Sequence, residues 1–183
     1  MIELPASPAP NGVTPRLIDY GSIERPPLGG ELTRIDRAGS RFAVEISWPA
    51  MTPDTAGAFV ARLLRAKRQG LTIPFPLLGR SQGFPGNTAF IDHKLALVTG
   101  AGQSGTTLAM QGMVPGYEWK EGYGLSPIDA TGRVYLHCCL PNTIVNGSGN
   151  ATIEIEPPLR APLPDGAFVL VSKPVIQGSS SMT

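Results

Sequence analysis

Residues 40–70 read SRFAVEISWPAMTPDTAGAFVARLLRAKRQG and hold the clearest strand and the clearest helix of the chain. The strand signal is a strict alternation of apolar and other side chains from Ser40 to Trp48. Because successive side chains of a strand point to opposite faces, this alternation predicts one apolar face and one mixed face. The apolar face consists of Phe42, Val44, Ile46 and Trp48, and the mixed face of Arg41, Ala43, Glu45 and Ser47.

The helix is expected to start at Thr52-Pro53-Asp54 and to end at Gly70. Thr52 or Asp54 can cap it, and proline is tolerated in the first helical turn. The helical spacing predicts one buried stripe, made of Ala56, Phe59, Val60, Leu63 and Leu64, with Lys67 at its end. The last turns are basic, which complements the negative end of the helix dipole. These side chains are candidate subunit-contact or lumen-facing residues: Arg62, Arg65, Lys67 and Arg68.

The composition of the 183 residues limits the class of protein. The 22 Gly and 19 Pro disfavour helix interiors and exclude an all-helical bundle. The net charge is only +1, so no overall field favours nucleic acid or an anionic membrane. The charged fraction of 16% lies well below the usual value of about 25%, so much of the surface is expected to be covered by neighbouring molecules.

The chain divides into two parts on either side of a proline- and glycine-rich stretch. Residues 1–75 are expected to form an arm and a β domain with one helix. The arm, residues 1–30, is rich in proline and glycine and should hold at most one or two short strands, around Arg16–Tyr20. Residues 74–88 form the expected linker, residues 89–177 a second β domain, and residues 178–183 a flexible tail.

The second part consists of short apolar runs separated by turn clusters, which is typical of a small antiparallel barrel or sandwich. The expected strands are Phe90–Val98, Thr106–Met110, Tyr117–Trp119, Val134–Leu140, Ala151–Ile155 and Ala167–Val171. The expected turns include Gly100–Gly105 and Pro157–Pro164. The run from Ala167 to Ile176 could return to pair with the first half. The predicted fold class is therefore mainly β: a sandwich with one packed helix, plus a second small barrel or sandwich.

Gly100, Gly102 and Gly105 match the G-x-G-x-x-G pattern of dinucleotide-binding turns. That pattern binds a pyrophosphate only when the third glycine opens a helix. The residues after Gly105 alternate as a strand does, and Thr106 stands where a P-loop requires lysine. The motif therefore predicts a glycine-rich hairpin turn, and no cofactor is expected.

Other chemistry-bearing residues do not form a catalytic or metal-binding pattern. His93 and His137 are far apart, and successive strand residues such as Cys138 and Cys139 point to opposite faces and cannot converge on one ion. Carboxylates are expected at outward strand and turn positions: Glu118, Glu121, Glu154 and Glu156. The aromatic residues are scattered and are expected to pack in cores and interfaces: Tyr20, Trp48, Phe75, Phe84, Tyr117, Trp119, Tyr123 and Tyr135. No catalytic, cofactor-binding or metal-binding residue is predicted, and the protein is not expected to be an enzyme.

Several segments resemble the minor tail and distal tail proteins of long-tailed bacteriophages. In the first half these are LGGELTRIDRAGSRF (28–42), the strand that ends at Pro49, and the helix AFVARLLRAKRQG (58–70). In the second half they are GAGQSGTTL (100–108), GMVPG (112–116), IEPPLR (155–160) and DGA (165–167). Together they extend from about Leu28 to Ile176.

The resemblance implies a structural virion protein of the tail tip, with a tail-tube-like β domain that assembles into a homo-oligomeric ring, expected to be a hexamer. Its implied partners are other tail proteins: tube, hub and tape measure. The implied location is the virion tail, after assembly in the host cytoplasm. No signal peptide or apolar span is seen, and neither a membrane nor a specific nucleic acid is expected as a partner. The alternatives are a tail-tube, tail-terminator or baseplate connector protein, a carbohydrate-binding tail adhesin module and, from a third class, an NAD-dependent reductase built on the glycine turn.

Overall fold

The computed structural model describes residues 1–5, 7–35, 37, 39–75 and 96–179. It is mainly β with one helix, as the sequence predicts. The elements of the first half are β1 (Ile2–Glu3), β2 (Gly12–Ile18), β3 (Ser22–Glu24), β4 (Thr33–Ile35), β5 (Arg41–Ser47), α1 (Pro53–Gln69) and β6 (Leu71–Pro74). Those of the second half are β7 (Leu97–Val98), β8 (Gln103–Gln111), β9 (Glu118–Trp119), β10 (Gly124–Pro127), β11 (His137–Cys139), β12 (Thr143–Ile144), β13 (Ala151–Leu163), β14 (Val169–Leu170) and β15 (Val175–Gly178).

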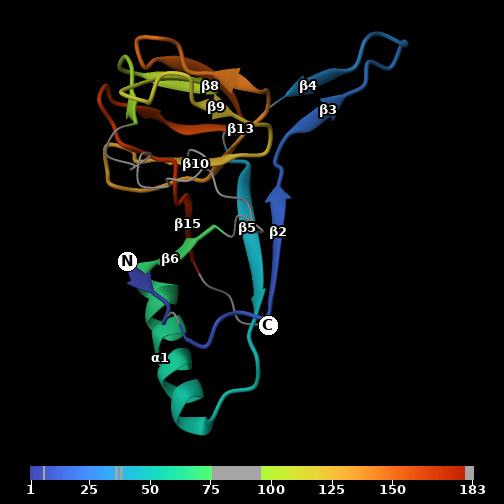
Figure 1. Cartoon of the computed structure of the whole chain (residues 1–183). Helices are drawn as coiled ribbons and strands as arrows, with labels where there is room; N and C mark the ends of the chain where they lie inside the picture. Colours follow the sequence, from blue (N-terminus) through green and yellow to red (C-terminus); the bar gives the residue numbers. More distant parts are fainter. Residues whose placement is uncertain (6, 36, 38, 76–95, 180–183) are drawn as a thin grey trace.

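Strands β2, β3, β4 and β5 form a long two-stranded ribbon, which from here on we call the arm. This arm differs from the predicted arm of residues 1–30, because it includes β4 and β5. The strands β2 and β5 pair in antiparallel register, and β3 and β4 continue the ribbon beyond the barrel (Figure 1). Apolar residues face one another across the first ladder: Val13 opposite Ile46, Pro15 opposite Val44 and Leu17 opposite Phe42. The alternation predicted for Ser40 to Trp48 is therefore confirmed as a strand. The expectation of at most one or two short strands in residues 1–30 is wrong, because β5 supplies a pairing partner that local sequence does not reveal.

The helix α1 begins and ends close to the predicted residues. Thr52 occupies the N-cap position with extended backbone, and Pro53 is the first helical residue. The Thr52 hydroxyl contacts the Thr55 hydroxyl at 3.0 Å instead of capping a backbone N–H. Gly70 ends the helix with a φ of 80° and donates its N–H to the Ala66 carbonyl at 2.8 Å, which explains why glycine stands there.

The predicted buried stripe of α1 is partly wrong. Phe59 and Ala66 are buried, and Ala56 and Leu63 are half-buried, so the buried side follows a narrow stripe. Val60 and Leu64 are instead 44% and 53% exposed, and Lys67 is also exposed. The apolar residues of α1 span more of its circumference than its neighbours β1 and β6 cover, so only part of the apolar surface is buried.

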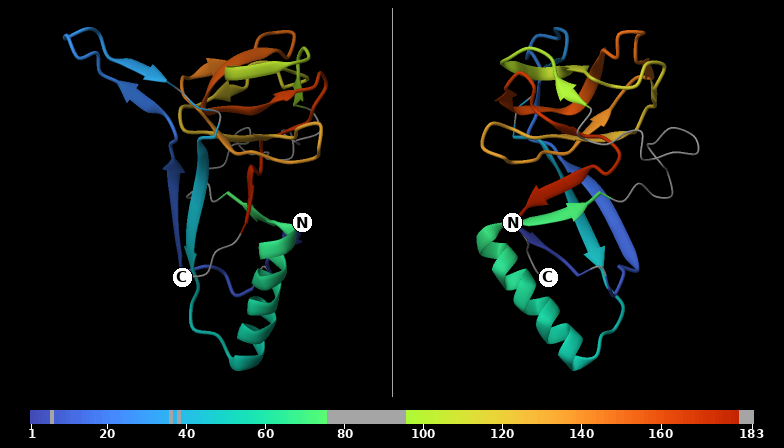
Figure 2. Two further views of the ribbon diagram at one scale, coloured as in Figure 1. Left: turned by 180° about the vertical axis from the view of Figure 1, so that it is seen from behind. Right: turned by 60° about the vertical axis from the view of Figure 1, so that its left-hand side comes forward.

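The first and last strands of the described chain meet at β6. The strand β1 pairs with β6 in parallel and β15 pairs with it antiparallel, forming a three-stranded sheet beside α1 (Figure 2). The barrel is tied to this sheet through the buried Ser126, whose hydroxyl donates to the Val175 carbonyl at 2.9 Å and accepts its N–H at 3.0 Å. Most of the expected linker, residues 76–88, lies outside the described residues, as do residues 180–183 of the expected tail.

The second half is a small antiparallel barrel. Its six strands follow the order β14-β10-β11-β13-β8-β7. A bridge between Leu97 and Phe168 joins the two edge strands, and the Val98 N–H donates to the Ala167 carbonyl at 2.9 Å. The sheet is thus nearly closed, which removes most of the unpaired edge that an open sheet presents.

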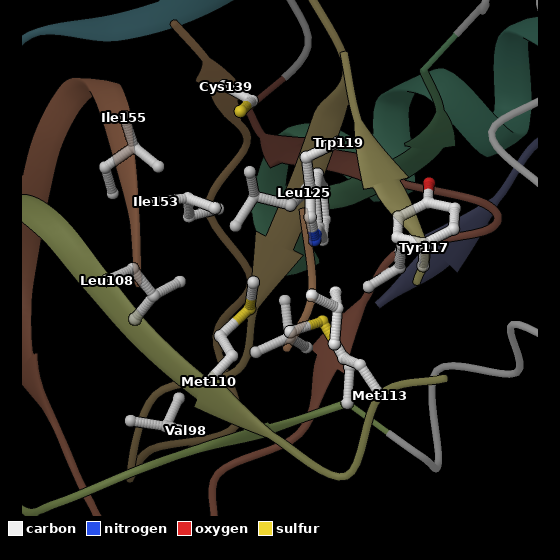
Figure 3. Close-up of a cluster of buried hydrophobic side chains, with 14 of the residues drawn as sticks. Val98, Leu108, Met110, Met113, Tyr117, Trp119, Leu125, Cys139, Ile153 and Ile155 are labelled. Atoms are coloured by element: carbon white, nitrogen blue, oxygen red, sulfur yellow. The ribbon is translucent and has the colours of Figure 1, made fainter. Parts of the chain in front are cut away.

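The barrel buries a continuous apolar core (Figure 3). Alternate residues of its strands point inward, among them Leu108 and Met110 from β8 and Ile153 and Ile155 from β13. Trp119, which comes from the separate β9–β12 pair, is completely buried among them. The interior is therefore filled by side chains, as expected for a barrel of this size.

The strand β13 continues through Pro157, Pro158 and Pro162, where a turn was predicted at Pro157–Pro164, and it ends just before Pro164. Its register against β8 shifts between Glu154 and Leu159 and again between Leu159 and Leu163. Proline cannot donate to a ladder but is tolerated where a ladder is irregular. The prediction of a turn is wrong because the prolines lie at these irregular positions.

Candidate functional site

The first half of the chain, which contains the arm and α1, has few buried apolar side chains among its described residues. Among the described residues up to Phe75, the buried apolar side chains are Phe59, Ala66 and Leu71, whereas residues 96–179 bury eighteen. Two ring contacts connect the arm and its C-terminal extension to the rest of this half: Phe42 with Phe75 at 6.1 Å between ring centres, and Trp48 with Phe59 at 4.8 Å. Between them, Val44 and Ile46 stay half-buried. The apolar interior of the first half is therefore incomplete in the isolated chain.

The bend between the two ladders of the arm is held by Asp19. Its carboxylate accepts hydrogen bonds from the Gly21 N–H at 2.8 Å and from the Ser40 hydroxyl at 2.8 Å, and it forms an ion pair with Arg34 at 3.2 Å. The Ser40 hydroxyl in turn accepts the Tyr20 N–H at 3.0 Å. The hydrogen bond from Gly21, then that from Ser40, lowers the pKa of Asp19 below its usual value. These contacts set the direction of the ladder of β3 and β4 relative to the ladder of β2 and β5.

Sequence reasoning did not identify Asp19 or Ser40. The Asp-Tyr-Gly order of residues 19–21 was an available signal, because an aspartate often accepts a hydrogen bond from the N–H two residues later. The role of Ser40 has no local signal, since its partners lie about twenty residues away.

Replacing Ser40 by Ala should loosen this bend without unfolding the chain. Ser40 is 2% exposed, so the change removes the acceptor of the Tyr20 N–H and one of the donors to the Asp19 carboxylate. We expect the free energy of local opening to fall by about 1 kcal/mol, which corresponds to about fivefold faster hydrogen exchange at the amides of Tyr20 and Gly21. Hydrogen–deuterium exchange measures it, with Ser47→Ala in β5 as the matched control. Unchanged exchange at residues 19–21 would contradict this role.

The four basic side chains singled out in α1 are all exposed. Arg62, Arg65 and Arg68 follow one another at three-residue spacing. Lys67 and Arg68 lie one turn beyond the exposed Leu64, three and four residues after it. None of the four forms an ion pair with another residue in the described ranges. Their charges are therefore available for contacts with other molecules.

His137 is a buried histidine of the barrel whose pKa is strongly lowered. It is 1% exposed, and its Nδ1 lies 2.6 Å from the Pro157 carbonyl oxygen, so Nδ1 carries the proton and donates. Its Nε2 is buried with no hydrogen-bond partner among the described residues. Burial lowers the pKa of His137 to about 4, which keeps the ring neutral. The other histidine, His93, lies outside the described residues.

The two cysteines point to opposite faces of β11, as predicted. Cys139 is buried in the barrel core, whereas Cys138 is half-buried on the outer side. Burial raises the pKa of both thiols, that of Cys139 to about 11, so neither is an activated nucleophile. In the described ranges, no group of three or more His, Cys, Asp and Glu side chains could hold a metal ion.

The glycine-rich motif forms a turn, but a shorter one than the predicted Gly100–Gly105. Gly100 and Gly102 lie in the turn with φ values of 87° and 75°, whereas Gly105, with a φ of 83°, lies inside strand β8 opposite Leu159, where the register is irregular. The Gly100 N–H donates to the Asp165 carboxylate at 2.7 Å. A pyrophosphate would need these N–H groups at the start of a helix, so the turn lacks the element that binds dinucleotides.

The barrel's aromatic residues are used mainly inside it. Tyr117 and Trp119 are buried and pack edge to face at 5.6 Å. Tyr135 is half-buried under the guanidinium of Arg160, whose carbon lies 4.9 Å from the ring centre. Phe84 lies outside the described residues. The described positions of Tyr117, Trp119 and Tyr135 fit the predicted packing role, whereas Phe168 is 48% exposed.

Comparison with known proteins does not assign a family to this chain. No family model matches it, and no curated protein matches its sequence. Within the described residues, no helix is long and apolar enough to cross a membrane.

Proposed function

We propose that the protein is a structural subunit of a bacteriophage tail tip that assembles into a homo-oligomeric ring through its first half. The supporting observation is the contrast between its two halves. The barrel buries eighteen apolar side chains, whereas the described part of the first half buries three. A half with so little core gains most from burial against neighbouring subunits.

The arm supports the same proposal. Isolated two-stranded ribbons are only marginally stable in water. Here the ladder of β3 and β4 extends past the barrel. Ile23 in β3 is 63% exposed, and Leu32, just before β4, is 60% exposed. A ribbon of this kind is stabilised when it lies on another protein surface. The low charged fraction of 16% agrees with a surface that neighbours cover.

The barrel would then be the peripheral domain of each subunit, facing away from the ring contacts. Its nearly closed sheet and complete core fit an independently stable unit. The carbohydrate-binding alternative lacks a supporting feature in the described residues, since Tyr117 and Trp119 are buried.

Two measurements test the proposal. Mass photometry of the purified chain should show a discrete complex, and six copies of the 19.3 kDa chain would weigh about 116 kDa. Mass spectrometry of purified phage tails from the strain that encodes the chain should detect it in fixed proportion to the tube protein, and gold-labelled antibody should mark the tail tip. Its absence from purified tails would refute the tail role, whatever its oligomeric state.

A further inference from the structure

The arm ends in a strongly exposed apolar tip, which we define as residues 23–34. Leu28 is 98% exposed at a turn in which the Gly29 N–H bonds to the Pro26 carbonyl at 3.3 Å. Ile23, in β3, and Leu32, just before β4, are also exposed. Large apolar side chains exposed together at the end of one element can form an interaction site.

A second exposed apolar surface lies on α1. Val60 and Leu64, 44% and 53% exposed, are four residues apart and therefore adjacent on one side of the helix. Lys67 and Arg68 follow on the next turn, three and four residues beyond Leu64. This side, the α1 flank, is an apolar stripe that ends in two positive charges.

The tip and the flank are complementary in charge. Glu24 and Glu31 carry negative charge next to Ile23 and Leu32, and Arg25 carries one positive charge. Arg34, the remaining cation of the tip, is engaged with Asp19. The tip thus offers leucine and isoleucine side chains with an excess of carboxylate, and the flank offers valine and leucine with two cations. Opposite charges at the edge of an apolar contact set its register and orientation.

The two surfaces cannot meet within one chain. The tip lies past the barrel, whereas α1 lies beside the opposite end of the arm (Figures 1 and 2). The hydrogen bonds of Asp19 and Ser40 hold the tip in that direction. A contact between tip and flank therefore joins two copies.

We propose that the arm tip of one copy docks on the α1 flank of a neighbouring copy, with Leu28 and Leu32 against Val60 and Leu64, and Glu31 near Lys67. The proposal rests on the proposed function, for which it names the subunit interface. Because tip and flank are different surfaces, the contact is head-to-tail: each copy gives one tip and receives another. Such a contact propagates from copy to copy and closes into a ring when the rotation allows it.

The test uses three single variants of the full chain. Leu28→Asp changes the tip, Leu64→Asp changes the flank, and Ile144→Asp changes a side chain that is 68% exposed on the barrel and serves as the matched control. All three positions are exposed, so circular dichroism should show unchanged folds. We expect each of the first two changes to weaken assembly by about 100-fold, because it removes a central apolar contact and places a charge there. Ile144→Asp should assemble as the wild-type protein does.

Mixing the two disrupted variants gives the sharpest result. The Leu64→Asp copy keeps an intact tip and the Leu28→Asp copy keeps an intact flank, so an equal mixture should form two-chain complexes of about 39 kDa and nothing larger. In the wild-type background, Glu31→Lys should weaken assembly, and adding Lys67→Glu should restore it.

Three results would overturn the proposal: assembly of both aspartate variants at wild-type strength, failure of the mixture to form the two-chain complex, or a wild-type chain that stays monomeric at about 100 µM. If the wild-type ring forms and both aspartate variants also form it, the interface is wrong and the proposed tail function stands. If the chain is absent from purified tails while tip and flank do bind, the tail function is wrong and the interface stands.

Discussion

Trp119→Ala should lower the free energy of unfolding of the barrel by about 3–5 kcal/mol, because truncating a buried tryptophan removes its apolar contacts and leaves a cavity. Trp119 is completely buried, packs against the Tyr117 ring, and lies among Leu125 and Met110 in Figure 3. In urea, a loss of this size should move the unfolding midpoint down by about 2 M. Far-ultraviolet circular dichroism is the suitable probe, since the substitution changes the fluorescence.

Two other substitutions serve as controls for this prediction. Trp119→Phe keeps a ring in the core and removes an indole N–H that has no hydrogen-bond partner among the described residues, so we expect a loss below about 1.5 kcal/mol. Trp48→Ala lies in the first half against Phe59 and should leave the barrel transition unchanged. A loss below about 1 kcal/mol for Trp119→Ala would contradict a closed, tightly packed barrel core.

The second large effect is acid destabilisation through His137. Burial lowers the pKa of this ring to about 4 in the folded protein, whereas the pKa of a histidine in the unfolded chain is near its ordinary value of 6.5. Between these values the unfolded chain binds the extra proton, so stability is full above about pH 6.5 and falls as the pH is lowered to about 4. The difference corresponds to about 3 kcal/mol. Urea titrations at intervals from pH 7.5 to 4 measure it.

His137→Leu is the matched variant for this prediction. Leucine has a similar size and no ionisable group, so the variant should lose the part of the pH dependence between about 6.5 and 4 that His137 causes. It should be less stable than the wild type near pH 7, because the Pro157 carbonyl then lacks the donor at 2.6 Å. His93 is present in both proteins, so any contribution it makes cancels in their difference. Identical pH profiles would show that His137 is not held neutral by burial.

Local patterns predicted much of the fold. The alternation at residues 41–47 and the start and end of α1 depend on side-chain spacing and on Thr52, Pro53 and Gly70, so they could be read from a few adjacent residues. A glycine turn followed by a strand was predicted for the same reason, because the alternating residues after Gly105 fit a strand and not a helix, although the strand begins earlier than predicted, at Gln103.

Predictions failed where the answer depends on distant partners. Strand β2 pairs with β5, which begins more than twenty residues later along the chain, so the prediction of at most one or two short strands in residues 1–30 was wrong. The side of α1 that becomes buried depends on where β1 and β6 lie, and this left Val60 and Leu64 exposed. The prolines of β13 predicted a turn, yet its irregular register accommodates them.

The candidate assembly surface was predicted only in part. The basic residues of α1 stand out in the sequence, and all of them proved to be exposed. Three other features could be recognised only in the folded molecule. They are the exposure of Val60 and Leu64 beside these basic residues, the bend held by Asp19 and Ser40, and the position of the tip far from α1.

The sequence predicted a mainly β chain with one helix, because strand alternation, helical spacing and glycine or proline turns act over a few neighbouring residues. The near closure of the barrel, and the small number of apolar side chains buried in the described part of the first half, depend instead on tertiary contacts. Burial is a property of what packs against a residue, and those neighbours come from distant parts of the chain: β15 returns to β6, and Leu97 meets Phe168. The same physical reason makes the uncovered surfaces of the arm and α1 visible only in the folded molecule.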